Sequence, residues 1–274
     1  MCRWLAYTGG AIRLEHLLFK PKHNIIDQSL SSRSPETPTN GDGFGIGWYG
    51  DLDRPGLYHS IRPAWNDFNL RDLAEQVQSR LFMAHVRATS LATIQETNCH
   101  PFRYKNWLFV HNGEIFEFGK IHQQLLNAIS PEYFQNIYGT TDSEVMFHLA
   151  LTFGLMDDPL GGIARMVGFI EKVCNERGVK EPVWMTVCVS DGHKIYAVRY
   201  ATDKDAPTLY ISPDIRYIYE VNPEISNLFG SSARAIVSEP VGDYSDSWKL
   251  IPQSSSVMVE ADSEYIIRDF QPLS

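Results

Sequence analysis

The sequence lacks the patterns that mark secreted and membrane proteins. It has only four cysteines, at positions 2, 99, 174 and 188, and no two of them form a CxxC pair. An even cysteine count without a signal peptide is weak evidence for disulfide bonds, so a reducing, cytoplasmic location is expected. The N-terminus has no basic stretch followed by an apolar one, and no apolar run approaches about 20 residues. Neither a secretory signal nor a membrane-spanning helix is therefore predicted.

Basic residues are scarce relative to acidic ones. The chain has 24 Lys and Arg against 33 Asp and Glu, which gives a net charge of −9, and no basic run stands out. A nucleic-acid or membrane partner is therefore not expected. The composition, with 43% hydrophobic and 21% charged residues, is that of an ordinary globular protein.

No internal repeat and no low-complexity linker divides the 274 residues. A chain of this length can form one large domain or two small ones. We expect a single domain over residues 1–274, with a division near residue 180 as the alternative, because the sequence after Pro182 becomes rich in strand-like segments.

Apolar periodicity predicts strands, then helices, then strands again. Strands are predicted at 3–7, 44–50, 56–64, 81–89 and 107–115, and helices at 70–80 (opened by Asn69), 120–129, 143–155 and 161–178. Residues 31–43 read as a loop, and an Asp-Gly turn within 183–200 predicts a hairpin. Since no βαβ alternation occurs, the pattern indicates an α+β layered fold, into which two face-to-face sheets between helices would fit.

Cys2 directly follows the initiator methionine. Removal of Met1 would leave a residue that carries both a thiol and an α-amine, whose pKa of about 7.7–8.0 suits it to accept the thiol proton. One residue would then supply nucleophile and base. The alternative is that Cys2 is a small buried residue of the first strand.

Three further segments contain candidate site residues, each with an ordinary structural alternative. Arg87 ends the apolar run of HVRATS and could bind a carboxylate in a bidentate manner or form a surface ion pair. Asn112 and Gly113 in FVHNGEI could form a turn or donate two hydrogen bonds to an oxyanion. Asp142 in TTDSEV could cap a helix, as could Thr141, or accept hydrogen bonds from an ammonium group.

The segment ETNCHPF raises the question of a metal site. Cys99 and His100, with His85 and His111, could in principle bind zinc, but no second local pair of ligands is present. A structural turn is the favoured interpretation. The glycines of NGDGFGIGWYG match neither common phosphate-binding pattern.

Taken together and in this order, the N-terminal Cys, the strand-end Arg, NCHPF, HNG and TDSE resemble the class II glutamine amidotransferases, which are N-terminal nucleophile hydrolases. The resemblance covers residues 2–260. The segments NGDGFG, RPAWN, HVRA, ETNCHPF and TDSE, and the later SEPVGDYSDSWKLIP, are most similar to a branch of stand-alone members. That branch includes the amidohydrolase subunit of the cytosolic glutathione-degrading complex and the amidohydrolase of ergothioneine synthesis.

The resemblance implies a four-layer αββα sandwich of the N-terminal nucleophile hydrolase type, with neither cofactor nor metal. It implies that Cys2 is the nucleophile, with its own amine as base. Asn112 and Gly113 would stabilise the tetrahedral oxyanion.

The same resemblance implies how the substrate is held. Arg87 would bind the α-carboxylate of a γ-glutamyl group and Asp142 its α-ammonium. The family also carries a threonine after the arginine. Either Thr89 or Ser90 could match it, and Thr89 is the expected substrate-binding residue.

The implied reaction is hydrolysis of a γ-glutamyl amide bond, in glutamine or in a γ-glutamyl peptide or thiol compound, with release of glutamate. A separate peptidase subunit could act beside it. Two alternatives stay open. The chain could be a glutaminase subunit that delivers ammonia to a separate synthase, or a catalytically silent protein that binds γ-glutamyl ligands.

Overall fold

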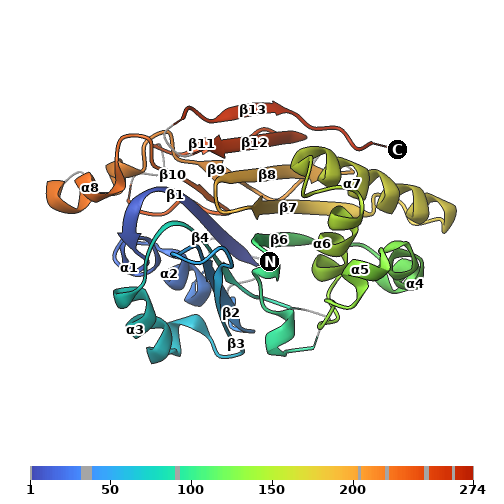
Figure 1. The fold of residues 1–274 in the computed structure, drawn as a ribbon, viewed down its shortest axis with the longest axis horizontal. Coiled ribbons are helices and arrows are strands. Elements are labelled where there is room, and N and C mark those ends of the chain that lie inside the picture. The colour runs from blue at the N-terminus through green and yellow to red at the C-terminus, as the bar shows by residue number, and fades with distance from the viewer. Residues whose placement is uncertain are drawn as a thin grey trace.

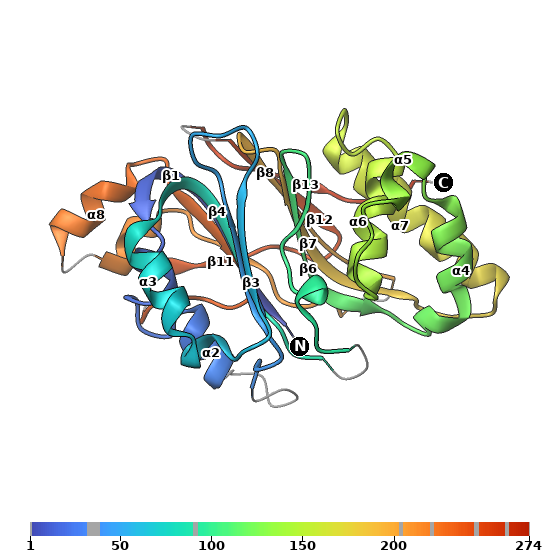
Figure 2. The same cartoon turned by 60° about the horizontal axis from the view of Figure 1, so that its bottom comes forward.

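The computed structural model describes residues 2–31, 39–89, 93–202, 205–219, 222–243, 247–260 and 263–273. Within them, two antiparallel sheets pack face to face between two layers of helices (Figure 1). Figure 2 shows the four layers most clearly, with α2 and α3 on one outer side and α4–α7 on the other. The expected αββα sandwich is confirmed.

The first sheet carries the start of the chain. Its strand order is β11-β9-β10-β1-β4-β2-β3. The strands are β1 (Arg3–Arg13), β2 (Phe44–Trp48), β3 (Gly56–Ser60), β4 (Gln78–Val86), β9 (Tyr210–Ile211), β10 (Arg234–Val237) and β11 (Lys249–Leu250). The first strand therefore lies in the middle of the sheet, between β10 and β4.

The second sheet has the order β13-β12-β8-β7-β6-β5. Its strands are β5 (Phe102–Tyr104), β6 (Trp107–Ile115), β7 (Val183–Ser190), β8 (Lys194–Ala201), β12 (Ser255–Glu260) and β13 (Ile266–Asp269). The predicted hairpin is β7 and β8, joined at the Asp-Gly turn.

The helices divide between the two outer layers. Those beside the first sheet are α1 (Glu15–Leu18), α2 (Ile25–Leu30) and α3 (Phe68–Gln76), and those beside the second are α4 (Phe118–Ala128), α5 (Pro131–Phe134), α6 (Asp142–Thr152) and α7 (Pro159–Glu176). The chain also forms α8 (Pro223–Phe229) and the 3-10 turns η1 (Ala64–Asn66), η2 (Glu96–Asn98) and η3 (Ile215–Tyr219). No helix of the described ranges combines the length and apolar character that crossing a bilayer requires.

Alternation along the strands sorts side chains between the layers, because successive strand residues point to opposite faces. Even-numbered Trp4 and Ala6 of β1 and Leu108 and Val110 of β6 join a cluster buried between the two sheets, as do Leu81 and Met83 of β4. Their neighbours along each strand pack under the helices instead. The inner faces of β1, β4 and β6 are therefore in contact.

Some predicted boundaries were wrong. The helix predicted at 70–80 is α3, which begins at Phe68 after an Asp67 cap whose carboxylate accepts from the Leu70 N–H at 2.9 Å. It ends at Gln76, because residues 78–80 alternate between exposed and buried positions and pair with β1. Of the predicted loop at 31–43, residues 32–38 lie outside the described residues.

Candidate active site

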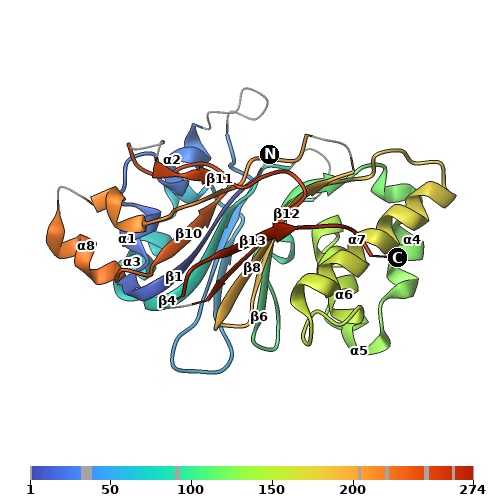
Figure 3. The same ribbon diagram turned by 90° about the horizontal axis from the view of Figure 1, so that it is seen from above.

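Cys2 lies directly before β1, at one end of the two sheets, as the position of the N-terminus in Figure 3 indicates. In the antiparallel pairing of β1 with β4, Arg3 faces Val86 and Trp4 faces His85. Extending this register by one position places Cys2 opposite Arg87. Since Trp4 and Met83 point between the sheets, alternation directs Cys2 and Arg87 there too.

The thiol of Cys2 makes two contacts with the backbone of Ala88. The Ala88 N–H donates to Cys2 Sγ at 3.4 Å, and the thiol donates to the Ala88 carbonyl oxygen at 3.4 Å. Burial raises the pKa of Cys2 and outweighs the opposing effects of the Ala88 N–H and the Arg87 charge. The thiol is therefore protonated at neutral pH, and a base must take its proton when it attacks.

Arg87 is buried, with 3% of its surface exposed, although its guanidinium is charged. Nη1 donates to the carbonyl oxygens of Thr93 at 3.3 Å and Asp42 at 3.5 Å. No ion pair within the described part of the chain includes Arg87. A buried cation held only by carbonyl dipoles favours the arrival of an anion, and the planar guanidinium suits a carboxylate.

Thr89 follows two residues later and is partly buried. Its N–H donates to Asp42 Oδ2 at 2.8 Å, so this segment is tied to the residues before β2. Ser90 lies outside the described residues, and the match of Thr89 to the family threonine stays a prediction.

Asn112 lies on the inner face of β6, in step with Leu108 and Val110, and it is 3% exposed. It faces Thr186 across the β6–β7 pairing. Trp4, two residues after Cys2, donates its indole N–H to Thr186 Oγ1 at 3.1 Å. The fold therefore brings Asn112 to the end of the sandwich that carries Cys2.

Gly113 adopts a φ of +142°, and a Cβ built there would lie 1.9 Å from the Trp184 carbonyl oxygen. Only glycine fits this position, because both the dihedral angle and the close approach of β7 exclude a side chain.

Asp142 is the first residue of α6, but it is not the helix cap. Thr141 is the cap, and its Oγ1 accepts from the Glu144 N–H at 3.2 Å. The Asp142 carboxylate accepts from the Ile115 N–H at 2.8 Å and from the Ser143 N–H at 2.8 Å. The carboxylate is thus held against the end of β6, the strand that also carries Asn112 and Gly113.

Glu114 is a neighbouring carboxylate that the sequence reasoning missed. It is partly buried, and burial, followed by the negative charge of Asp142, raises its pKa. Two carboxylates this close together favour a cation between them. The only signal in the sequence was an acidic residue directly after the Asn-Gly pair.

Arg3 was also missed, because its role depends on a distant residue. Its side chain lies on the face of the first sheet opposite to that of the Cys2 side chain. Its Nη1 donates to the Cys2 carbonyl oxygen at 3.0 Å and its Nε donates to Glu239 Oε2 at 3.1 Å. His23 binds the other carboxylate oxygen of Glu239. This network of Arg3, Glu239 and His23 holds the backbone of Cys2 in place.

The segment with Cys99 and His100 forms a structural turn. Cys99 is fully buried, and a Cβ on Gly43 would lie 2.8 Å from its Sγ. Asn98 donates to Thr140 Oγ1 at 3.1 Å. Throughout the described ranges, no three His, Cys, Asp or Glu side chains are arranged to hold a metal ion. The zinc alternative therefore finds no ligand set.

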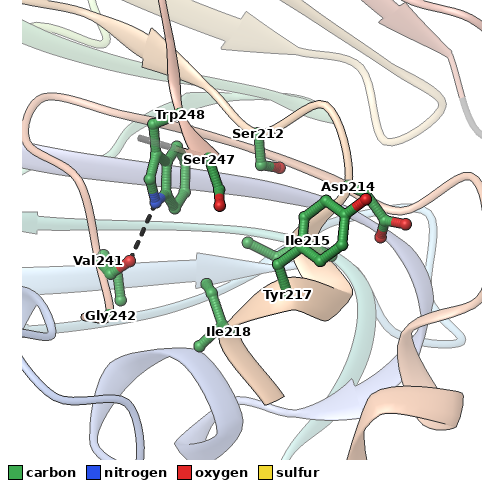
Figure 4. Close-up of a pocket in the computed structure, with 9 residues that line it drawn as sticks. All are labelled: Ser212, Asp214, Ile215, Tyr217, Ile218, Val241, Gly242, Ser247 and Trp248. Carbon is green, nitrogen blue, oxygen red and sulfur yellow. Dashed lines mark hydrogen bonds between the residues drawn. The ribbon is translucent and has the colours of Figure 1, made fainter. Parts of the chain in front are cut away.

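A small cavity elsewhere in the molecule contains none of these residues (Figure 4). It is lined by Ile215 and Ile218 of η3, by Val241 and by Trp248, whose indole N–H donates to the Val241 carbonyl oxygen at 3.0 Å. Its free volume of ≈ 10 Å³ is about what one water molecule needs. Its size and position separate it from the Cys2 region.

Comparisons with known proteins identify the family of the chain. The family model described as glutamine amidotransferases class-II matches residues 23–203, a range that includes Arg87, Asn112 and Asp142 and begins after Cys2. The chain is 36% identical to the probable glutamine amidotransferase DUG3 of Saccharomyces cerevisiae, over 95% of this chain and 82% of that protein. It is 30% identical, over 42% of this chain and 52% of that protein, to the gamma-glutamyl-hercynylcysteine sulfoxide hydrolase of Mycolicibacterium smegmatis.

Solved structures extend the likeness to the whole fold. A glutamine aminotransferase class-II domain protein from Silicibacter pomeroyi is 31% identical and superposes with a TM-score of 0.77 over 100% of both chains. The glutamine phosphoribosylpyrophosphate amidotransferase of Bacillus subtilis, 15% identical, shares the fold with a TM-score of 0.65 over 98% of this chain and 49% of its own. All four cysteines of the present chain are free thiols.

The chain belongs to the class II glutamine amidotransferases, has the sandwich fold of the N-terminal nucleophile hydrolases, and is an enzyme of the amidohydrolase type.

Proposed function

We propose that this enzyme hydrolyses a γ-glutamyl amide bond through a γ-glutamyl thioester on Cys2 and releases glutamate. The observation that carries the proposal is the position of Cys2 opposite Arg87, a buried guanidinium with only carbonyl partners in the described ranges. A thiol beside a buried guanidinium suits a substrate with an amino-acid head and a reactive carbonyl. The similarity to the probable glutamine amidotransferase DUG3 and to the gamma-glutamyl-hercynylcysteine sulfoxide hydrolase supports the same chemistry.

Binding would fix the head of the substrate before reaction. Arg87 pairs with the α-carboxylate, with Thr89 beside it, and Asp142 accepts hydrogen bonds from the α-ammonium. Since Arg87 and Thr89 follow β4 while Asp142 begins α6, these groups hold the head from separate elements and set the orientation of the γ-carbonyl over the sulfur. Binding energy at the head is thereby used to align the reacting atoms.

The reaction then runs in two stages. Once Met1, which lies outside the described residues, has been removed, the α-amine of Cys2 takes the thiol proton while Sγ attacks the γ-carbonyl carbon. Asn112 and the Gly113 N–H donate to the resulting oxyanion, each contributing about 3 kcal/mol to lowering the barrier. The C–N bond breaks, the amine leaves with the proton, and water then hydrolyses the thioester to glutamate and regenerates the thiol.

The substrate is proposed to be a γ-glutamyl peptide or thiol compound, so the leaving amine is the amino compound that the γ-glutamyl group was attached to, rather than ammonia. The similarity to the gamma-glutamyl-hercynylcysteine sulfoxide hydrolase of Mycolicibacterium smegmatis supports the larger substrate. A separate peptidase or synthase subunit is part of the proposal, as are a single domain over residues 1–274 and a cytoplasmic location.

A substrate panel tests the proposal. Glutamate release is measured from glutamine, glutathione, γ-glutamylcysteine and a γ-glutamyl anilide, with protein whose N-terminus has been sequenced. Cys2→Ala abolishes release from every substrate, whereas Cys174→Ala, which removes a buried thiol of α7, keeps the activity. A preference for glutamine would instead favour the ammonia-delivering alternative. Binding without release by protein that begins at Cys2 would favour the silent one.

A further inference from the structure

His85 connects the two sheets beside the proposed oxyanion hole. It lies on the inner face of β4, is 1% exposed, and places Nε2 3.2 Å from the carbonyl oxygen of His111. A carbonyl oxygen can only accept, so Nε2 carries the proton. Burial lowers the pKa of His85 to about 3 against the opposing effect of this hydrogen bond, and the ring is neutral at physiological pH.

This hydrogen bond crosses from one sheet to the other. β4 belongs to the sheet that carries Cys2, and β6 to the sheet that carries Asn112. The accepting carbonyl belongs to the peptide group that joins His111 to Asn112. The bond therefore holds the backbone immediately before Asn112.

A second crossing bond lies on the other side of Asn112. Trp4 is the register partner of His85, and its indole donates to Thr186, the register partner of Asn112. The two bonds therefore bracket Asn112 and fix its position relative to the start of β1.

The side chain of His111 continues this line of hydrogen bonds toward α6. Its Nδ1 lies 2.8 Å from Ser143 Oγ, and the Ser143 hydroxyl donates to Asp142 Oδ1 at 3.3 Å. His85, His111, Ser143 and Asp142 therefore connect β4, β6 and the beginning of α6.

We propose that His85 is a positioning residue, a neutral hydrogen-bond donor that sets the separation between the Cys2 thiol and the oxyanion donors Asn112 and Gly113. The proposal rests on the proposed function. Its physical basis is that the nucleophile and the oxyanion hole lie on different sheets, and among the described residues these sheets meet here through the two crossing hydrogen bonds and through apolar packing. Apolar contacts tolerate small sliding, whereas a donor aimed at an oxyanion loses its effect with displacements near 1 Å.

A matched pair of variants tests this role. In His85→Gln, the side-chain Nε2 reaches the place of the imidazole Nε2 and can still donate to the His111 carbonyl. His85→Asn has the same polar group but is one methylene shorter, so it cannot reach. We expect His85→Asn to lower kcat at least about tenfold with KM changed less than about twofold, and His85→Gln to recover most of the loss. Glutathione, glutamine and the γ-glutamyl anilide serve as probes, and thermal unfolding is recorded for each variant.

The outcomes separate the two proposals. If the unmodified enzyme hydrolyses a probe and Cys2→Ala does not, the proposed function stands. Equal kcat values for His85→Gln and His85→Asn, or a change confined to KM, would then overturn the role of His85 alone. Should both variants fail to fold, Thr186→Val, which removes the acceptor of the second crossing bond at similar volume, replaces them. A kcat equal to that of the unmodified enzyme in Thr186→Val would overturn the proposal.

Discussion

The guanidinium of Arg3 and the carboxylate of Glu239 form a buried ion pair, 3.1 Å apart, between residues separated by 236 positions. The same guanidinium donates to the carbonyl oxygen of Cys2. The backbone of the proposed nucleophile is therefore held by Arg3, whose guanidinium is anchored in turn by Glu239, a residue near the other end of the sequence.

Because of this ion pair, the free energy of unfolding is expected to fall as the pH becomes acidic. Burial acts to raise the pKa of Glu239, but hydrogen bonds from His23 and Arg3 outweigh it and the pKa is lowered. A carboxyl group with a depressed folded-state pKa stabilises the fold above its unfolded pKa of about 4.3, and this contribution disappears as the pH falls through the folded value. We expect Glu239→Gln to lower the free energy of unfolding by about 3 kcal/mol at pH 7 and by progressively less as the pH falls below about 4.3.

Urea denaturation of the enzyme and of Glu239→Gln across this pH range measures the effect. Asp243→Asn provides the control, because Asp243 pairs with Lys22 where both side chains are exposed. The control is expected to change stability by less than about 1 kcal/mol at every pH. If the free energy of unfolding varied with pH in the same way for the enzyme and for Glu239→Gln, the lowered pKa assigned to Glu239 would be contradicted.

Arg87→Lys tests the carboxylate site. A lysine ammonium is a point charge and cannot replace the two parallel N–H donors of a guanidinium, so KM is expected to rise about tenfold or more while kcat falls less. Steady-state kinetics on the best substrate of the panel measures both constants. Arg80→Lys, at an exposed position of the same strand, controls for the change of residue type. A KM equal to that of the control would rule out contact between Arg87 and the substrate.

Asn112→Ala tests the oxyanion role. Loss of one donor to the developing charge lowers kcat by about 10²–10³ and leaves KM close to its original value. Pre-steady-state kinetics adds a second readout, because thioester formation should slow with it. An effect on KM alone would mean that Asn112 binds the ground state of the substrate instead.

Gly113→Ala tests the backbone geometry of β6. The added Cβ would meet the Trp184 carbonyl oxygen at 1.9 Å at a φ of +142°, so β6 and β7 must separate locally. We expect a loss of about 2 kcal/mol or more in stability, together with a fall in kcat. Gly119→Ala on α4 is the matched control, since no atom lies within 4 Å of its added Cβ. The control should be neutral or stabilise the helix by about 0.5–1 kcal/mol.

Local sequence patterns predicted much of the fold. The strand predicted at 107–115 is β6 without change, because its dense β-branched and aromatic residues are buried on both faces. The helix predicted at 70–80 ended early, since pairing with β1 recruits residues 78–80 into a strand. Helical propensity there was overridden by a tertiary contact that the local pattern does not contain.

The candidate site was predicted only in part, and for a similar reason. Cys2, Arg87, Asn112 and Asp142 each stand in a recognisable motif. These residues come together through the β1–β4 register and the hydrogen bond between Trp4 and Thr186. Both contacts join distant parts of the chain. Arg3 and Glu114 had no motif, because what distinguishes them is the partner each meets after folding.

The central position of β1 has a consequence for the making of the protein. Leu5 to Thr8 pair on one side with β4 and on the other with β10, whose residues 234–237 leave the ribosome long after β1 has done so. Until then one edge of the first strand stays open, so in the proposed mechanism Met1 can be removed before β10 closes that edge. The first sheet is therefore completed only late in translation, when residues 234–237 have been made.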